Sequence, residues 1–96
     1  MTRHFVSRHP GAARWLARQK ISVDRFHGHL KLEQIAPGDV VYGTLPIHLA
    51  AAVCARGAEY WHLSLTMPAS LRGQELSVDQ LEQLDARLCR FVVYEP

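Results

Sequence analysis

The chain has 96 residues, 48% of them hydrophobic, and a net charge of +2. This length fits one domain over residues 1–96 and excludes two domains of ordinary size. The composition excludes a disordered chain, and the small net charge excludes a strongly acidic or strongly basic protein.

The first third of the chain alternates strand and helix patterns. Residues 3–7 (RHFVS) predict a strand with Phe5 and Val6 buried, and Pro10 stands at a position typical of the first turn of a helix. A second short strand is predicted at 23–27, followed by a turn of helix or a loop at 30–39. The residues expected on the inner face of the first helix are Ala12, Trp15, Leu16 and Gln19.

The middle of the chain repeats this alternation. Residues 40–42 form a short, continuous apolar run, which is typical of a strand covered on both faces. A helix is predicted from Ile47 to Arg56, with Gly57 as a left-handed cap after it. Because nearly every residue of this helix is apolar, we expect it to be buried on more than one side.

The last third predicts strands at 60–65 and 89–94, separated by a polar loop at 66–75 and a helix. Ser77 and Gln80 have the spacing of a capping box, which opens that helix. Its expected inward residues are Val78, Leu81, Leu84 and Leu88. The order of the elements predicts one compact α/β domain, with a mostly parallel sheet of about five strands and helices on both faces.

The cysteines and the apolar segments indicate where such a protein resides. Cys54 and Cys89 lie far apart without metal-ligand spacing, which favours reduced residues of a cytosolic protein. Basic side chains at Arg3 and Arg8 interrupt the first apolar run, which argues against a signal peptide. The most apolar stretch, 45–55, is too short to span a membrane. We expect a soluble, cytoplasmic protein without a membrane partner.

Two strand-to-helix junctions share one design. The segments Ser7 to Gly11 (SRHPG) and Gly43 to Pro46 (GTLP) each leave a predicted strand and enter a helix with a proline in its first turn. In an open α/β sheet, helix N-termini at the carboxyl ends of the strands direct N–H groups toward ligands such as phosphate. Gly43 would let the backbone approach closely, and Thr44 would add a hydroxyl at the N-cap.

The first junction also carries reactive side chains. Ser7, Arg8 and His9 supply a hydroxyl, a fixed cation and a proton-transfer group. Nine of the eleven basic residues are arginine, which suits an anionic ligand, although a genome rich in G and C produces the same bias. Proline, glycine and a capping hydroxyl are also ordinary turn residues, and neither segment is a Walker loop. The residues alone therefore leave a structural turn and an anion site as equal interpretations.

The other histidines favour structural roles. His27 and His29 flank a glycine without a carboxylate or thiol at ligand spacing. His48 lies one turn into its helix, where it would either face the GTLP turn or pack, and packing is favoured. His62 alternates with Trp61 and Leu63 in a strand, which is typical of a core or surface histidine, and His4 lies at the opposite end of its strand from the junctions. A two-metal nuclease needs a close pair of carboxylates, and the sequence offers no such pair. We therefore expect neither a metal nor a cofactor.

A resemblance to a known family is carried by the segments FVSRHPGAARW, VDRFHGHL, PGDVVYGTLPIHLAAAVCARGAEYWHLSL, LRGQELS and FVVYEP. In these segments the chain resembles the Csx-sixteen family of small accessory proteins found beside type III CRISPR systems. The similarity runs from Thr2 to about Val93. Its distinguishing motifs are the SRHPGA and GTLP turns and the loop Leu71 to Gly73.

The resemblance implies a CARF-like Rossmann domain that forms a homodimer and binds cyclic oligoadenylate, in particular cyclic tetra-adenylate, and no long nucleic acid. It also implies a ring nuclease that needs no metal: a ribose 2′-hydroxyl attacks the adjacent phosphate and leaves linear products with a 2′,3′-cyclic phosphate. We expect catalytic residues at Ser7, Arg8 and His9. We expect ligand contacts from Pro10, Gly11, Gly43, Thr44, Leu45, Pro46 and Arg72.

Two other functions stay open at this point. A non-catalytic module would bind and sequester the same messenger without cutting it. A protein-interaction subunit would use the apolar helix at 47–55 and would bind no nucleotide.

Overall fold

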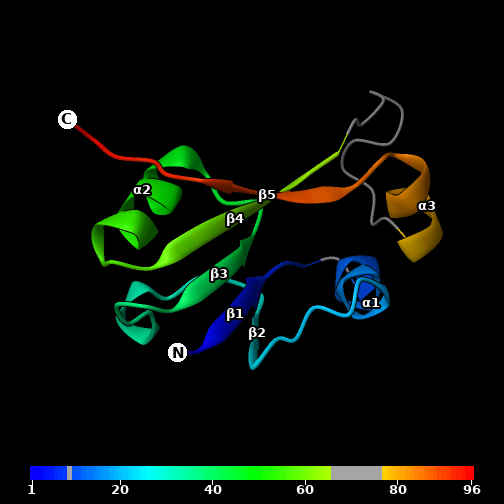
Figure 1. Cartoon of the computed structure of the whole chain (residues 1–96), viewed down its shortest axis with the longest axis horizontal. Coiled ribbons are helices and arrows are strands. Elements are labelled where there is room, and N and C mark those ends of the chain that lie inside the picture. The colour runs from blue at the N-terminus through cyan, green and yellow to red at the C-terminus, as the bar shows by residue number, and fades with distance from the viewer. Residues whose placement is uncertain (9, 66–76) are drawn as a thin grey trace.

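A computed structural model describes residues 1–8, 10–65 and 77–96 (Figure 1). Its strands are β1 (Arg3–Val6), β2 (Arg25–His27), β3 (Val40–Gly43), β4 (Glu59–Ser64) and β5 (Arg87–Phe91). Its helices are α1 (Pro10–Arg18), α2 (Ile47–Ala55) and α3 (Val78–Gln83), with a short 3-10 turn, η1 (Leu32–Gln34). In the part of the chain that is described, no helix combines the length and the apolar character that crossing a membrane requires.

The five strands form one sheet in the order β2-β1-β3-β4-β5. Neighbours among the first four strands are parallel, and β5 pairs with β4 antiparallel. The prediction of a mostly parallel, Rossmann-like sheet of about five strands is therefore confirmed. The chain runs from β1 through α1 to β2 on one side, and from β3 through α2 to β4 on the other. The strand order thus reverses between β1 and β3, and such a reversal is where open α/β sheets bind ligands.

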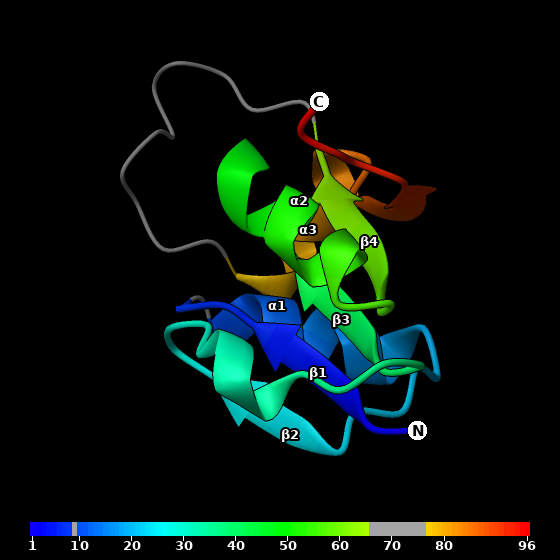
Figure 2. The same cartoon turned by 90° about the vertical axis from the view of Figure 1, so that its left-hand side faces the viewer.

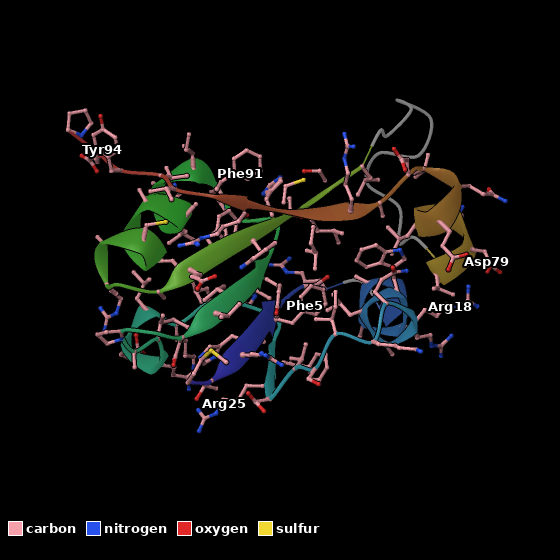
Figure 3. The ribbon with its side chains drawn as sticks, in the orientation of Figure 1. Phe5, Arg18, Arg25, Asp79, Phe91 and Tyr94 are labelled. Carbon is pink, nitrogen blue, oxygen red and sulfur yellow. The ribbon has the colours of Figure 1, made fainter. Side chains whose placement is uncertain are left out.

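Helices cover both faces of the sheet, as Figures 1 and 2 show from two directions. α1 and α3 lie together on one face, where Phe5, Trp15 and Leu81 belong to one buried cluster. α2 covers the other face, where Val41 and Val53 belong to a second cluster. Arg18 of α1 joins the two helices of the first face through ion pairs with α3, one of them to Asp79 at 3.2 Å (Figure 3).

A network of hydrogen-bonded polar side chains lies at the end of the sheet where the parallel strands begin. His4 is fully buried, and its Nε2 lies 2.9 Å from Oδ2 of Asp39. The other ring nitrogen of His4 lies 3.0 Å from Nε2 of His27 on β2. Asp39 also accepts hydrogen bonds from the N–H groups of Thr2 and Ala36. These hydrogen bonds hold β1, β2 and the loop before β3 together at the end of the sheet that lies away from the two junctions.

The structure corrects two details of the predicted packing. Gln19 lies beyond the end of α1 and is exposed, because the helix stops at Arg18 before its fourth inward position is reached. Leu88 belongs to β5, since α3 ends after Gln83. Both cysteines are unpaired, as expected.

The burial of α2 differs most from expectation. Only Ala50 and Val53 of this helix are buried, and Ile47 is strongly exposed. The helix packs against the sheet on one side, and its apolar pattern continues onto a side that no element of the described chain fully covers. Gly57 does follow the helix with a φ of 83°, as predicted for a left-handed cap.

Candidate functional site at the carboxyl ends of the parallel strands

The carboxyl ends of the four parallel strands meet around a cavity of about 810 Å³. The described residues that line it are Phe5, Val6, Ser7, Arg8, Ala12, Gly28, His29, Leu30, Gly43, Thr44, Leu45, Pro46, Leu49, His62, Leu63, Ser64, Leu65 and Leu81. Among these residues Arg8 carries a permanent positive charge and none is acidic. The cavity lies at the reversal of strand order between β1 and β3, so the topology and the charge both favour an anionic ligand.

The turn after β1 brings Ser7 and Arg8 to this cavity. The Ser7 N–H donates to the carbonyl oxygen of His27 at 2.9 Å, which extends the pairing of β1 with β2 by one residue. A guanidinium nitrogen of Arg8 lies 3.1 Å from Nδ1 and 3.2 Å from Nε2 of His29. Arginine only donates, so His29 accepts through a ring nitrogen that bears no hydrogen. This contact holds the Arg8 guanidinium at the mouth of the cavity.

The turn after β3 is built tightly against β1. Gly43 pairs with Val6, and a Cβ at Gly43 would lie only 2.7 Å from the Val6 carbonyl oxygen. A side chain is therefore excluded there, and the backbone itself lines the cavity. Thr44 is not the predicted N-cap of α2, because Pro46 occupies that position and the Thr44 hydroxyl donates to the carbonyl of Leu63 at 3.1 Å. That bond ties the turn to β4.

The N-termini of α1 and α2 both begin at this end of the sheet. α1 starts at Pro10, directly after the turn that carries Ser7 and Arg8, and α2 starts at Ile47, directly after the turn at Gly43. The first N–H groups of a helix have no partner within the helix and carry the positive end of its dipole. The two helix starts therefore add positive partial charge at the end of the sheet where Arg8 also lies.

Two histidines complete the cavity, and both were assigned structural roles from the sequence. His29 follows β2 by two residues and contacts Arg8. His62 lies on β4, opposite Gly43 in the register, and its Nδ1 lies 2.6 Å from the hydroxyl of Tyr60. In the sequence, the two-residue spacing of Tyr60 and His62 indicates that both side chains lie on one face of a strand. Only the register of the sheet shows that this pair lies beside the turn at Gly43.

The chain matches one family model over residues 4–94, described as "Putative CRISPR-associated protein (Cas_VVA1548)". The chain belongs to this family of CRISPR-associated proteins. Comparison with curated proteins and with solved structures found no match.

Within this CRISPR-associated protein the predicted site residues fall into three groups. Ser7, Arg8, Gly43, Thr44, Leu45 and Pro46 all line the cavity, so the two junctions do come together. Gly11 is buried in α1 without lining it, and Pro10 begins that helix. His9 and Arg72 lie outside the described residues. His48 is exposed on α2, which contradicts the expected packing, and it is not among the described lining residues.

The remaining histidines are divided between different partners. His27 bonds to His4 whereas His29 contacts Arg8, so the His-Gly-His segment does not converge on one point. Burial lowers the pKa of His27, and the nearby His4, Arg25 and Lys31 lower it further. Within residues 1–8, 10–65 and 77–96, no three His, Cys, Asp or Glu side chains are grouped as metal ligands.

Proposed function

We propose that this CRISPR-associated protein binds cyclic tetra-adenylate in the cavity between β1 and β3 and cleaves it as a metal-independent ring nuclease. The observation that carries the proposal is that Arg8, the turns that lead into α1 and α2, and the backbone of Gly43 meet at one cavity whose described lining residues include no acidic one. These are groups that bind phosphodiesters through charge and N–H donors rather than through a metal. The resemblance to ring nucleases supplies the identity of the phosphodiester.

The proposed chemistry places two demands on the cavity. The ribose 2′-oxygen must be held in line with the departing 5′-oxygen, which is a matter of positioning. The extra negative charge of the transition state must be stabilised, and Arg8 with the N–H groups of the helix starts supports this role. His9 stays a predicted proton-transfer residue, and Arg72 stays a predicted ligand contact.

We propose further that the active form is a homodimer. Cyclic tetra-adenylate has four phosphates and two-fold symmetry, and a two-fold dimer would offer it two copies of both junctions. Exposed apolar side chains on α2 and the C-terminal segment support a second copy as the partner: Ile47, Phe91, Val92 and Tyr94. Phe91 contacts His62 of the cavity, so this apolar surface begins beside the site. Figure 3 shows Phe91 and Tyr94 away from the β2 edge that carries Arg25.

The test is to incubate the purified protein with cyclic tetra-adenylate in EDTA and to separate the products by chromatography. A ring nuclease yields linear products that end in a 2′,3′-cyclic phosphate. Tight binding with an intact ring after long incubation would instead establish a sequestering module. Absence of binding would overturn both and would favour the protein-interaction function of α2.

A further inference from the structure

The two ring nitrogens of His62 differ in their hydrogen bonding. Its Nδ1 contacts the Tyr60 hydroxyl at 2.6 Å, and its ring meets Tyr60 and Phe91 edge-on. Its Nε2 has no hydrogen-bond partner within residues 1–8, 10–65 and 77–96. His62 lines the cavity, so its ring borders the space that a bound ligand would occupy.

The contacts of Tyr60 determine where the hydrogen of the His62 ring sits. The Tyr60 hydroxyl is buried and has three neighbours: the Leu45 N–H at 2.9 Å, the Gly43 carbonyl at 3.2 Å and Nδ1 of His62. The hydroxyl has one hydrogen and two lone pairs. Leu45 can only donate and Gly43 can only accept, so all three contacts are satisfied when Nδ1 of His62 carries a hydrogen and donates it.

The protonation state of Tyr60 agrees with this assignment. Burial raises the pKa of Tyr60, which keeps its hydroxyl hydrogen in place at neutral pH so that it can be donated to Gly43. A neutral histidine with its hydrogen on Nδ1 has a bare lone pair on Nε2. Tyr60 thereby joins the turn after β3 to a histidine whose free nitrogen is an acceptor.

We infer that His62 is the general base of the proposed ring cleavage, and that Tyr60 is the positioning residue that fixes its tautomer. The inference rests on the proposed function and assigns the proton acceptor within that site. In the step, Nε2 takes the proton of the ribose 2′-hydroxyl while the 2′-oxygen bonds to phosphorus. The bond from phosphorus to the 5′-oxygen breaks, and the 5′-oxygen takes a proton from solvent. The His62 imidazolium then releases its proton to solvent.

The variant that tests the base is His62→Asn, because the asparagine amide can replace the Nδ1 donor to Tyr60 but has no basic nitrogen. We expect its kcat to fall by about 10²-fold or more, which is the usual contribution of a general base. A cyclic tetra-adenylate ring with methylated 2′-hydroxyls cannot react, so it allows binding to be measured alone. We expect the affinity of His62→Asn for this ring to equal that of the unmodified protein. His48→Asn is the matched control, because His48 is exposed outside the cavity and should keep full activity.

A second variant keeps the inference testable if the first one folds poorly. His62→Gly leaves room for free imidazole, and we expect added imidazole to restore cleavage at least in part. For Tyr60→Phe, the ¹⁵N shifts of the His62 ring should lose the Nδ1–H signature while the fold is retained.

Three outcomes overturn the inference or the function beneath it. Undiminished kcat in His62→Asn, or no rescue of His62→Gly by imidazole, would remove His62 from the base role. An unchanged His62 tautomer in Tyr60→Phe would remove Tyr60 from its positioning role. Absence of cleavage by the unmodified protein would instead overturn the ring nuclease itself, so the two failures are distinguishable.

Discussion

Gly43 and Val6 end the two central strands so close together that a Cβ on Gly43 would lie 2.7 Å from the Val6 carbonyl oxygen. The two residues are partners in the parallel register of β1 and β3. The strand order reverses between these strands, so their closeness leaves the backbone of both turns open to the same cavity. For this reason the two junctions that are alike in the sequence line the same cavity.

Replacing Gly43 by alanine should disturb this contact directly. The added methyl group meets a backbone carbonyl that cannot move away without separating β1 from β3, so we expect a loss of about 1–3 kcal/mol in the free energy of unfolding. Chemical denaturation measures it. Gly28→Ala is the matched control, because Gly28 also lines the cavity but has open space around its Cα. Equal stability of the two variants would contradict the close packing.

Replacing Arg8 by alanine should weaken ligand binding. Arg8 is the permanent cation among the described lining residues, so we expect affinity for cyclic tetra-adenylate to fall about tenfold or more, which is about 1.4 kcal/mol. Titration calorimetry with the methylated ring measures it. Arg14→Ala is the control, since Arg14 is exposed on α1 outside the cavity. An equal loss of affinity in both variants would show that the net charge of the protein, and not the position of Arg8, causes the effect.

Replacing Asp39 by asparagine should destabilise the fold without touching the cavity. Asp39 accepts hydrogen bonds from two backbone N–H groups and from the buried His4. Loss of the charge in this buried set should lower the free energy of unfolding by about 3 kcal/mol. Asp24→Asn is the control, because the Asp24 carboxylate is exposed and accepts the Arg3 N–H. Similar stability of both variants would show that the hydrogen bonds of Asp39 do not stabilise this end of the sheet.

The same carboxylate predicts a dependence of stability on pH. Burial disfavours the charge on Asp39, but hydrogen bonds from Thr2, His4 and Ala36 outweigh burial and lower its pKa from 3.8 to about 2. The unfolded chain therefore binds more protons than the folded chain between these values. Stability from Asp39 is fully present above pH 4 and is lost as the pH falls toward 2. Thermal unfolding across this range should show a decline that is weaker in Asp39→Asn.

Charging the C-terminal segment should separate the proposed dimer. Val92 is 76% exposed, so Val92→Asp should leave the folded chain intact while placing a charge in the interface. Sedimentation velocity should show a monomer for this variant and a dimer for the unmodified protein. Phe26→Ser is the control, because Phe26 is an exposed apolar residue on the opposite edge strand, β2. A monomer in Phe26→Ser and a dimer in Val92→Asp would move the interface to the β2 edge.

Much of the fold could be predicted from local patterns. For the described residues, the alternation of apolar runs and helical segments identified the order of strands and helices, although β5 begins two residues earlier than predicted and ends at Phe91. The spacing of Ser77 and Gln80 identified the capping box that the structure shows. Local patterns do not report what lies beyond an element, so the apolar helix at 47–55 was expected to be buried on more than one side. Which side of the helix stays exposed depends on the elements that pack against it, and the pattern within the helix does not report these.

The candidate site could be predicted only in part. Its turns follow from strand ends and helix starts, which the sequence marks with glycine and proline. His29 and His62 were missed because their roles depend on partners from other strands, Arg8 and the turn at Gly43. The link from Tyr60 to Leu45 spans fifteen residues and exists only after β3 and β4 pair. Chemistry that arises from pairing between strands cannot be found by spacing along one strand.

The central claim is that the ring binds at the carboxyl ends of β1 and β3, and amide NMR tests it most directly. Titration of the protein with cyclic tetra-adenylate whose 2′-hydroxyls are methylated should shift the amide signals of Arg8, Gly28, Gly43 and Thr44. The amides of Thr2, Asp24 and Asp39 at the other end of the sheet should stay in place. Shifts confined to that other end, or no shifts at millimolar ring, would contradict the site.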